Sequence, residues 1–425
     1  MTSLQPARGM HDLLPGDHQK HAFIITKALQ IAARYGFCEI STPMLEFKEV
    51  FKRTLGTTSD IISKEMYEMA SKGGEELVLR PEGTAGVARA VLSNGLTQSM
   101  PLKFCYTGPM FRYERPQKGR LRQFHHIGIE LFGVDSALGD VEVVSLAYDV
   151  LKALHLEERV TLEINTLGDE ESRTHYRTQL VAYLNDHLTK LSPDSQTRLT
   201  RNPLRILDSK DEGDKRILEN APLLKESLNT ASEDMFASVQ EGLQTLKIPF
   251  RINPHLVRGL DYYCHLAFEF TTTDLGSQGT VLAGGRYDGL TRTMGGPQIP
   301  GVGWAGGIER LAMMLREEDL PRPVRPLAVI AMEERFSFKG LELAEVLRQE
   351  GFRVDMTYEN NLGKCLKKSN KINALYALIV GEEEVRSHKV TCKNLDSGEQ
   401  MLVPQEEIGQ FFKDTYPQGR TGHES

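Results

Sequence analysis

The sequence predicts an α+β protein with a separate α/β domain in its C-terminal part. Residues 104–114 and 124–131 alternate in side-chain polarity on either side of the basic loop 115–122, as half-buried antiparallel arms do. Residues 169–230 are polar and charge-dense with helical spacing, which favours a helical insertion. After the proline-rich stretch 321–326, strand-like and helix-like segments alternate, which is typical of α/β domains.

The composition excludes several classes of protein. A chain of 425 residues, 40% hydrophobic and 26% charged, is consistent with two or three globular domains. The net charge of -7 argues against a general polyanion binder, so contact with nucleic acid would need a local basic patch. Long apolar runs and a signal-peptide pattern are both missing, so we expect a cytoplasmic protein that does not bind membranes. We expect the cysteines to be reduced core residues: Cys38, Cys105, Cys264, Cys365 and Cys392.

The N-terminal elements follow from capping and strand signals. Asp17 is the expected N-cap of a first helix, which ends at Gly36. A short strand at 37–43 follows, with proline at its end. Residues 77–80 form another strand, which runs into a helix from about Ala85.

The later elements alternate in the same way. After the hairpin we expect helices at 140–154 and 232–246 and strands at 160–166, 256–272 and 301–307, with a helix starting near Ile308. In the C-terminal domain we expect strands at 327–332, 352–357 and 374–380, and helices at 336–349 and 362–371.

The hairpin carries unusual polar residues for a sheet surface. Period-two alternation places Ile127, Ile129 and Leu131 on a core-facing side. The other side carries Phe104, Tyr106, Gly108, Met110, Arg112, Glu114, Phe124, His126, Gly128 and Glu130. The loop between the arms has cations at Arg115, Lys118, Arg120 and Arg122 and suits phosphates, although a solvated tip guarding a sheet edge has the same composition.

Three further places could face a ligand. Glu82 and Thr84 lie at a strand-to-helix turn, where they either point at a ligand or cap the helix. Alternation puts Tyr263 and Glu269 on one polar face. Arg310 lies in the first turn of a helix, where a cation is unfavourable because the helix N-terminus is itself positive. An anion held between the arginine and the helix end would explain it; the alternative is an ordinary surface arginine.

These residues suit a ligand with both phosphates and a charged amine. Arg112, Arg258 and Arg310 come from separate segments, while Walker and GxGxxG loops are missing. The carboxylates Glu82 and Glu130, with phenols nearby, would suit a cationic or zwitterionic group. A site for a triphosphate together with an amino acid would use both sets.

The motifs resemble those of the histidyl-tRNA synthetases, a class II aminoacyl-tRNA synthetase family. ARGMHDLLP, GFCEISTPMLEF, LRPEGT, FRYERPQKGRLRQFHHIGIELFG, LVRGLDYY, AGGRYDGL and GVGWAGGIERL occur in the family's order, and the likeness runs over nearly the whole chain. Motifs 1, 2 and 3 of class II would surround Pro43, Arg112 and Arg310, and LVRGLDYY and AGGRYDGL are the histidine-specific elements.

The resemblance implies a domain plan. The catalytic domain would be an antiparallel sheet in two parts, 1–168 with motifs 1 and 2 and 231–320 with the histidine elements and motif 3. The remaining parts would be the helical insertion at 169–230, a linker at 321–326 and an α/β anticodon-binding domain at 327–425. The implied partners are ATP with Mg²⁺, L-histidine, tRNA(His) and a second copy of the chain in a homodimer.

The resemblance also implies roles for individual residues. Histidine would be bound by Glu82, Gly83, Thr84, His126, Glu130, Tyr262, Tyr263 and Tyr287. ATP would be bound by Arg112, Glu114, Phe124 and Arg310, with Arg258 and Arg112 as catalytic residues. The tRNA acceptor end would meet Arg115, Gln117, Lys118 and Arg120. No protein metal ligands are implied.

One position departs from the family. His126 stands where the family usually has glutamine, so its contact and its effect on pH dependence are open; a neutral histidine still accepts a hydrogen bond.

Two other functions are compatible with parts of the sequence. One is the synthetase-like regulatory subunit of ATP phosphoribosyltransferase, but such proteins usually lack the anticodon domain and lose motif arginines. The other is a class II synthetase for another amino acid, which LVRGLDYY disfavours.

Overall fold

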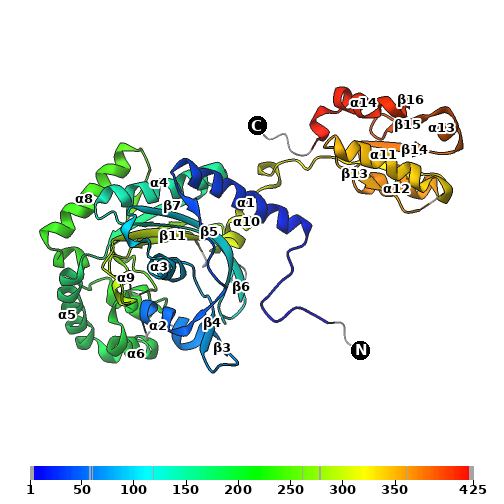
Figure 1. Cartoon of the computed structure of the whole chain (residues 1–425). Helices are drawn as coiled ribbons and strands as arrows, with labels where there is room; N and C mark the ends of the chain where they lie inside the picture. The colour runs from blue at the N-terminus through cyan, green and yellow to red at the C-terminus, as the bar shows by residue number, and fades with distance from the viewer. Residues whose placement is uncertain are drawn as a thin grey trace. The chain divides into compact units, whose positions relative to one another are not determined.

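The computed structural model describes residues 4–56, 59, 61–117, 119–260, 262–276, 279–359 and 361–420. The chain divides into two compact units, Met1–Leu320 and Pro321–Ser425, which Figure 1 shows in blue to yellow and in yellow to red. None of the helices within the described ranges combines the length and the apolar composition needed to cross a membrane.

The first unit is built on an eight-stranded sheet. Its strand order is β1-β5-β6-β11-β10-β9-β7-β8. In that order the bounds are Cys38–Glu39, Leu102–Phe111, Gln123–Phe132, Gly301–Gly307, Thr280–Arg286, Cys264–Thr271, Thr161–Thr166 and Arg251–Ile252. Neighbours run antiparallel except for the two edge pairs, β1 with β5 and β7 with β8. Strands β5 and β6 form the predicted hairpin, in which Gly108 lies opposite His126.

Helices cover both faces of this sheet (Figure 1). One face carries α1 (Pro15–Arg34), α4 (Ala137–Ala153), α8 (Thr230–Thr245) and α10 (Ile308–Met314). The other face carries α2 (Lys48–Leu55), α3 (Thr84–Ser93), α9 (Leu290–Thr293) and a small sheet of β2 (Leu45–Phe47), β4 (Glu76–Leu79) and β3 (Tyr67–Ala70). Ile127, Ile129 and Leu131 are buried in the core under α1 and α4, which confirms the predicted faces of β6.

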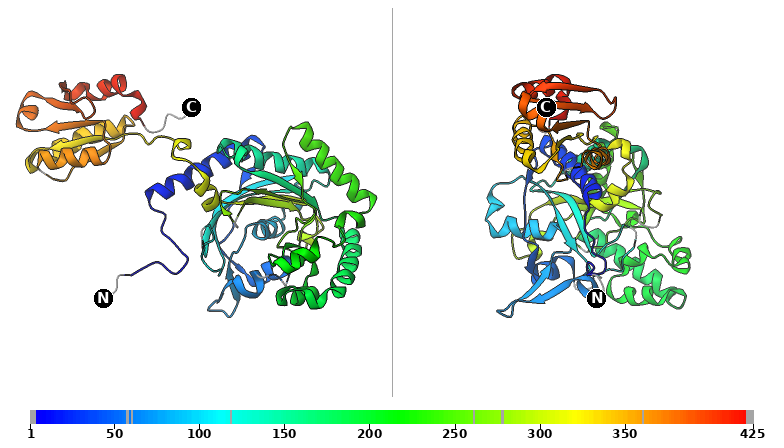
Figure 2. Two further views of the ribbon diagram at one scale, coloured as in Figure 1. Left: turned by 180° about the vertical axis from the view of Figure 1, so that it is seen from behind. Right: turned by 90° about the vertical axis from the view of Figure 1, so that its right-hand side faces the viewer.

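The segment before α8 folds into one long helix and two short ones. They are α5 (Glu170–Asp186), α6 (Pro193–Arg201) and α7 (Glu212–Leu218), drawn in green in Figure 2. Leu180, Leu184 and Ile206 are fully buried in a separate apolar cluster that this segment forms. Separately, the buried carboxylate of Asp214 accepts hydrogen bonds from the hydroxyl groups of three serines, which ties α6 and α7 together.

The second unit is a five-stranded α/β sheet. Its order is β13-β12-β14-β15-β16, with bounds Val354–Met356, Leu327–Ala331, Tyr376–Val380, Lys389–Asn394 and Gln400–Pro404. The first three strands are parallel and the last two antiparallel. Its helices are α11 (Ser337–Gln349), α12 (Leu362–Lys371), α13 (Glu382–Ser387) and α14 (Ile408–Thr415). The strands and helices predicted between 327 and 380 are confirmed; α13 and α14 were not expected.

Two local predictions in the N-terminal part are wrong. Helix α1 begins at Pro15 rather than after Asp17, because proline's fixed φ suits a first turn whose N–H groups have no helical partner. Cys38 is exposed, because it lies on the two-residue edge strand β1; the other four cysteines are buried.

The strand predicted at 256–272 begins only at Cys264. His265 has a φ of +44°, and the pairing of β9 with β10 shifts register opposite it, between Gly285 and Arg286. This bulge ends the alternation, so the residues before it approach the sheet as an irregular segment.

Candidate active site

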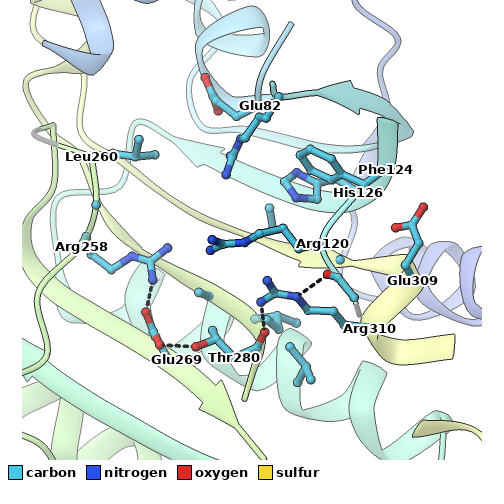
Figure 3. A pocket seen from close by; sticks show the side chains of 18 of the residues that line it. Glu82, Arg120, Phe124, His126, Arg258, Leu260, Glu269, Thr280, Glu309 and Arg310 are labelled. Atoms are coloured by element: carbon cyan, nitrogen blue, oxygen red, sulfur yellow. Dashed lines mark hydrogen bonds and ion pairs between the residues drawn. The ribbon is translucent and has the colours of Figure 1, made fainter. Parts of the chain in front are cut away.

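A cavity of about 360 Å³ lies on the face of the large sheet that also carries α3. Figure 3 shows its side chains coming from the hairpin, from the segment before β9 and from the start of α10. The predicted site residues that line it are Glu82, Thr84, Arg112, Glu114, Arg120, Phe124, His126, Arg258, Tyr262, Tyr263 and Arg310. The structure therefore brings together segments that are more than 200 residues apart in the chain.

Backbone carbonyl groups hold two of the three arginines in place. Arg112 Nε donates to the carbonyl oxygen of Pro81 at 2.9 Å. Arg310 Nε donates to Gly119 O at 3.1 Å and its Nη1 to Thr280 O at 2.6 Å. Arginine presents its five N–H donors in a planar fork that matches the geometry of phosphate oxygens, so the orientation of these two side chains suits an anion.

The third arginine is held by a carboxylate. Arg258 Nη1 donates to Glu269, whose other oxygen accepts from Thr280 Oγ1 at 2.8 Å (Figure 3). The guanidinium carbon of Arg258 lies 5.3 Å from the centre of the Tyr263 ring. Burial acts to lower the pKa of Arg258, but the Glu269 carboxylate and the Tyr263 and Tyr262 side chains together outweigh it and raise that pKa. Its buried Nε has no hydrogen-bond partner among the described residues, which leaves one N–H for a ligand.

A buried acidic network lies at the start of α3. The Glu82 carboxylate accepts from Thr84 N at 2.6 Å and from Ala85 N at 2.9 Å. The Thr84 hydroxyl donates to Glu130 Oε1 at 2.6 Å, and the Tyr287 hydroxyl donates to Glu130 Oε2. The capping alternative therefore applies to Glu82, while Thr84 is already inside the helix and links it to β6.

Two glycines make room for this network. A Cβ atom at Gly303 would lie 2.1 Å from Glu130 Oε2, and one at Gly128 would lie 2.4 Å from the Tyr106 hydroxyl. Real side chains cannot approach so closely, so glycine at both positions is a condition for burying the acid and the phenol.

Burial sets the protonation of these acids. It raises the pKa of Glu130 to about 8, against the opposing hydrogen bonds from Thr84 and Tyr287. It also raises the pKa of Glu82, although backbone N–H groups oppose the change. At neutral pH Glu130 is therefore mostly protonated, and a cationic ligand would favour its ionised form.

His126 faces the cavity beside Phe124, with ring centres 5.0 Å apart. Burial, and then the positive charges of Arg112 and Arg310, lower the pKa of His126 to about 3. Its ring is neutral at physiological pH, and its buried Nδ1 has no hydrogen-bond partner in the described part of the chain. A neutral imidazole at this position can accept from or donate to a ligand without adding charge.

Three predicted histidine contacts lie behind the cavity wall. Glu130 and Tyr287 are almost completely buried and do not line it; they reach it through Thr84. Gly83 packs against the ring of Tyr106, where a Cβ would lie 2.2 Å from a ring carbon.

The residues predicted to contact the tRNA acceptor end do not all line the same cavity. Arg120 lines the cavity and its Nε lies 2.7 Å from Glu114 Oε2. Arg115 lines a different cavity, of about 530 Å³. The backbone of Gln117 pairs with that of Arg120, and Lys118 lies outside the described residues.

Sequence reasoning missed several residues of the cavity. Glu269 had a signal, since alternation placed it on the polar face with Tyr263, yet no role was assigned to it. Glu309 also lines the cavity, and both its oxygens accept from His125 N, at 3.0 and 2.9 Å. That contact spans 184 residues, so no local pattern could indicate it.

Comparison with known proteins settles the family. The histidyl-tRNA synthetase family model matches residues 9–311, and the anticodon binding domain model matches residues 327–415. This chain belongs to the histidyl-tRNA synthetase family. The predicted resemblance and the predicted fold class are thereby confirmed.

Curated relatives match over nearly their full length. The chain is 55% identical to a histidine–tRNA ligase of Rhodospirillum rubrum over 95% of this chain and 97% of that protein. It is 50% identical to the histidine–tRNA ligase of Gluconacetobacter diazotrophicus over 94% and 96% respectively. The crystal structure of apo S. aureus histidyl-tRNA synthetase matches with a TM-score of 0.81 and 30% identity, over 97% of this chain and all of that one (100%).

Proposed function

We propose that this chain attaches L-histidine to tRNA(His) in two steps, through a histidyl-adenylate. The observation that carries the proposal is the meeting of Arg112, Arg258 and Arg310 in one cavity beside the Glu82–Thr84 turn. The match to histidine–tRNA ligases over nearly the full length supports the same activity.

In the first step the histidine carboxylate attacks the α-phosphorus of ATP and pyrophosphate leaves. Negative charge then increases on the phosphate oxygens, and fixed cations in a partly buried cavity stabilise it. We assign Arg258 and Arg112 to this role, and assign ATP binding to Arg112, Glu114, Phe124 and Arg310. The hydrogen bonds that hold these arginines before ATP arrives reduce the reorganisation that the reaction needs.

Histidine recognition is assigned to the acidic network and the phenols around it. Glu82, Gly83, Thr84, His126, Glu130, Tyr262, Tyr263 and Tyr287 would form this part of the site. Glu130 can give up its proton when the cationic amine of histidine arrives, because an opposite charge favours the ionised carboxylate. Neutral His126 would contact the substrate without repelling its ammonium group.

Magnesium would accompany ATP. Mg²⁺ takes oxygen ligands and usually binds through one or two carboxylates together with substrate phosphates. Four carboxylates line the cavity, and oxygen donors of this kind fit the ion. Two of them, Glu114 and Glu269, lie beside the arginines that we assign to the phosphates and would hold the ion there. When bound, the ion would neutralise phosphate charge and help orient the triphosphate.

In the second step a hydroxyl group of the 3′-terminal ribose of the tRNA attacks the carbonyl carbon of the histidyl-adenylate, so that an ester bond forms and AMP leaves. We propose that Arg115, Gln117, Lys118 and Arg120 meet the acceptor end. We also propose a homodimer in the cytoplasm, a catalytic domain at 1–168 and 231–320, an insertion at 169–230, a linker at 321–326 and an anticodon-binding domain at 327–425.

The regulatory-subunit alternative is not favoured. The curated relatives at 50–55% identity are histidine–tRNA ligases. The motif arginines are present and meet in one cavity, and an anticodon-binding domain follows.

An ATP–pyrophosphate exchange assay with each amino acid in turn tests the proposal. We expect exchange with histidine alone. Exchange that depends on a different amino acid, or no exchange together with no charging of tRNA(His), would contradict it.

A further inference from the structure

A second cavity lies beside the candidate active site, within the first unit. Its volume is about 280 Å³, and it is bounded by the helical insertion on one side and by the segment before β9 on the other. Its wall carries five arginines: Arg173, Arg177, Arg201, Arg205 and Arg258. No acidic residue is found among the described residues that line it.

The charges of this cavity are only partly neutralised. Arg258 pairs with Glu269, and Arg173 Nη1 donates to the carbonyl oxygen of Tyr263 at 2.5 Å, which is not an ion pair. For Arg177 and Arg201 no ion pair or hydrogen bond of the side chain occurs among the described residues. Both side chains line the cavity and are exposed, so an anion from solvent can reach them.

The two cavities share part of their wall. Arg258, Leu260 and Tyr263 line both of them. An anion in the second cavity would therefore lie next to the group that we assign to the reacting phosphate. Arginine binds phosphate oxygens in bidentate fashion, which suits a lining of this kind.

We propose that the second cavity is an anion site that holds a phosphate group during the reaction. The proposal rests on the proposed function, which supplies two sources of that phosphate. One is the pyrophosphate that leaves ATP, and the other is a phosphodiester near the 3′ end of the tRNA. Both sources present phosphate oxygens. Binding of pyrophosphate would affect the KM for pyrophosphate, and binding of the phosphodiester would affect the KM for tRNA(His).

The test uses the double substitution Arg177→Ser with Arg201→Ser in the full-length chain. Neither residue lines the first cavity, so histidine-dependent ATP–pyrophosphate exchange should keep its kcat. Arg216→Ser is the matched control, because Arg216 is an exposed arginine of the same insertion that lines neither cavity. The KM for pyrophosphate is measured in exchange and the KM for tRNA(His) in aminoacylation.

We expect the double variant to raise one of these constants about tenfold or more, while the control leaves both unchanged. A higher KM for tRNA with a weaker salt dependence identifies the tRNA phosphate, because each lost contact reduces the slope by about 0.7 for a single strand. A higher KM for pyrophosphate alone identifies the leaving group.

If neither constant changes in the double variant, or if the control changes them equally, the anion site is refuted. Arg177→Gln with Arg201→Gln repeats the test with longer side chains that preserve more of the packing. Failure of the unmodified protein to catalyse histidine-dependent exchange would instead refute the proposed function, so the two failures are distinguishable.

Discussion

The buried carboxyl group of Glu130 should make the stability of the protein depend on pH. Burial raises the pKa of Glu130 from 4.5 to about 8, so the folded protein holds this proton where the unfolded chain has lost it. The stabilising contribution of the protonated carboxyl is complete below the unfolded value of 4.5 and is lost as the pH rises through about 8.

The substitution Glu130→Gln isolates this effect, because glutamine has the shape of the protonated acid and does not titrate. As the pH rises from about 5.5 to about 8.5, the free energy of unfolding of the unmodified protein should fall by about 3 kcal/mol more than that of the variant. Guanidinium titrations of both ligand-free proteins at the two pH values measure the difference, with a common slope against denaturant. Other titrating groups contribute to both proteins and largely cancel.

The substitution Glu163→Gln is the control for Glu130→Gln. Burial acts to raise the pKa of Glu163, but the hydrogen bonds from Asn253, Arg251 and Thr271 and the charge of Arg251 together outweigh it and lower that pKa. The contribution of Glu163 is therefore constant over the same pH interval, and Glu163→Gln should shift the stability equally at both pH values. A Glu130→Gln difference that varies by less than about 1 kcal/mol would show that Glu130 is not the group that holds the proton.

Three further predictions follow from the site and the core. Phe124→Ala should raise the KM for ATP about tenfold in the exchange assay, because loss of an aromatic stacking partner for a base costs about 1–3 kcal/mol. His126→Gln should leave the pH profile of the KM for histidine unchanged between about pH 6 and 9, because a group whose pKa is about 3 is already neutral there; a displaced profile would contradict this. Arg286→Met should lower the free energy of unfolding by about 3–5 kcal/mol in guanidinium titrations, because it leaves the fully buried Asp140 carboxylate without its partner.

The sequence predicted the parts of the site that local patterns encode. Alternation along the hairpin placed His126 and Glu130 on one face and Ile129 on the other, because strands present successive side chains to opposite sides. The meeting of Arg112 with Arg310 followed from the family resemblance, since nothing in either segment alone points to the other.

Local sequence patterns could not predict the bulge in β9, the cap of α3 or the long-range contacts of the site. The bulge at His265 depends on a positive φ that the alternation of apolar residues does not encode. The sequence left open whether Glu82 caps a helix or faces a ligand, and only the folded chain shows that its carboxylate accepts from Thr84 N and Ala85 N while it also lines the cavity. The contact of Arg310 with the Gly119 carbonyl joins residues 191 apart, and only the folded sheet brings them together.

The most direct test of the proposed mechanism is the rate of histidyl-adenylate formation in Arg258→Met. Because Glu269 would lose its partner, the double variant with Glu269→Gln is measured as well, and the exposed Arg316→Met is the control. Loss of one fixed donor to the transition state should slow adenylate formation about 100- to 1,000-fold in both Arg258 variants, with the control unchanged. An unchanged rate in the double variant would contradict the assignment of Arg258 to the reacting phosphate.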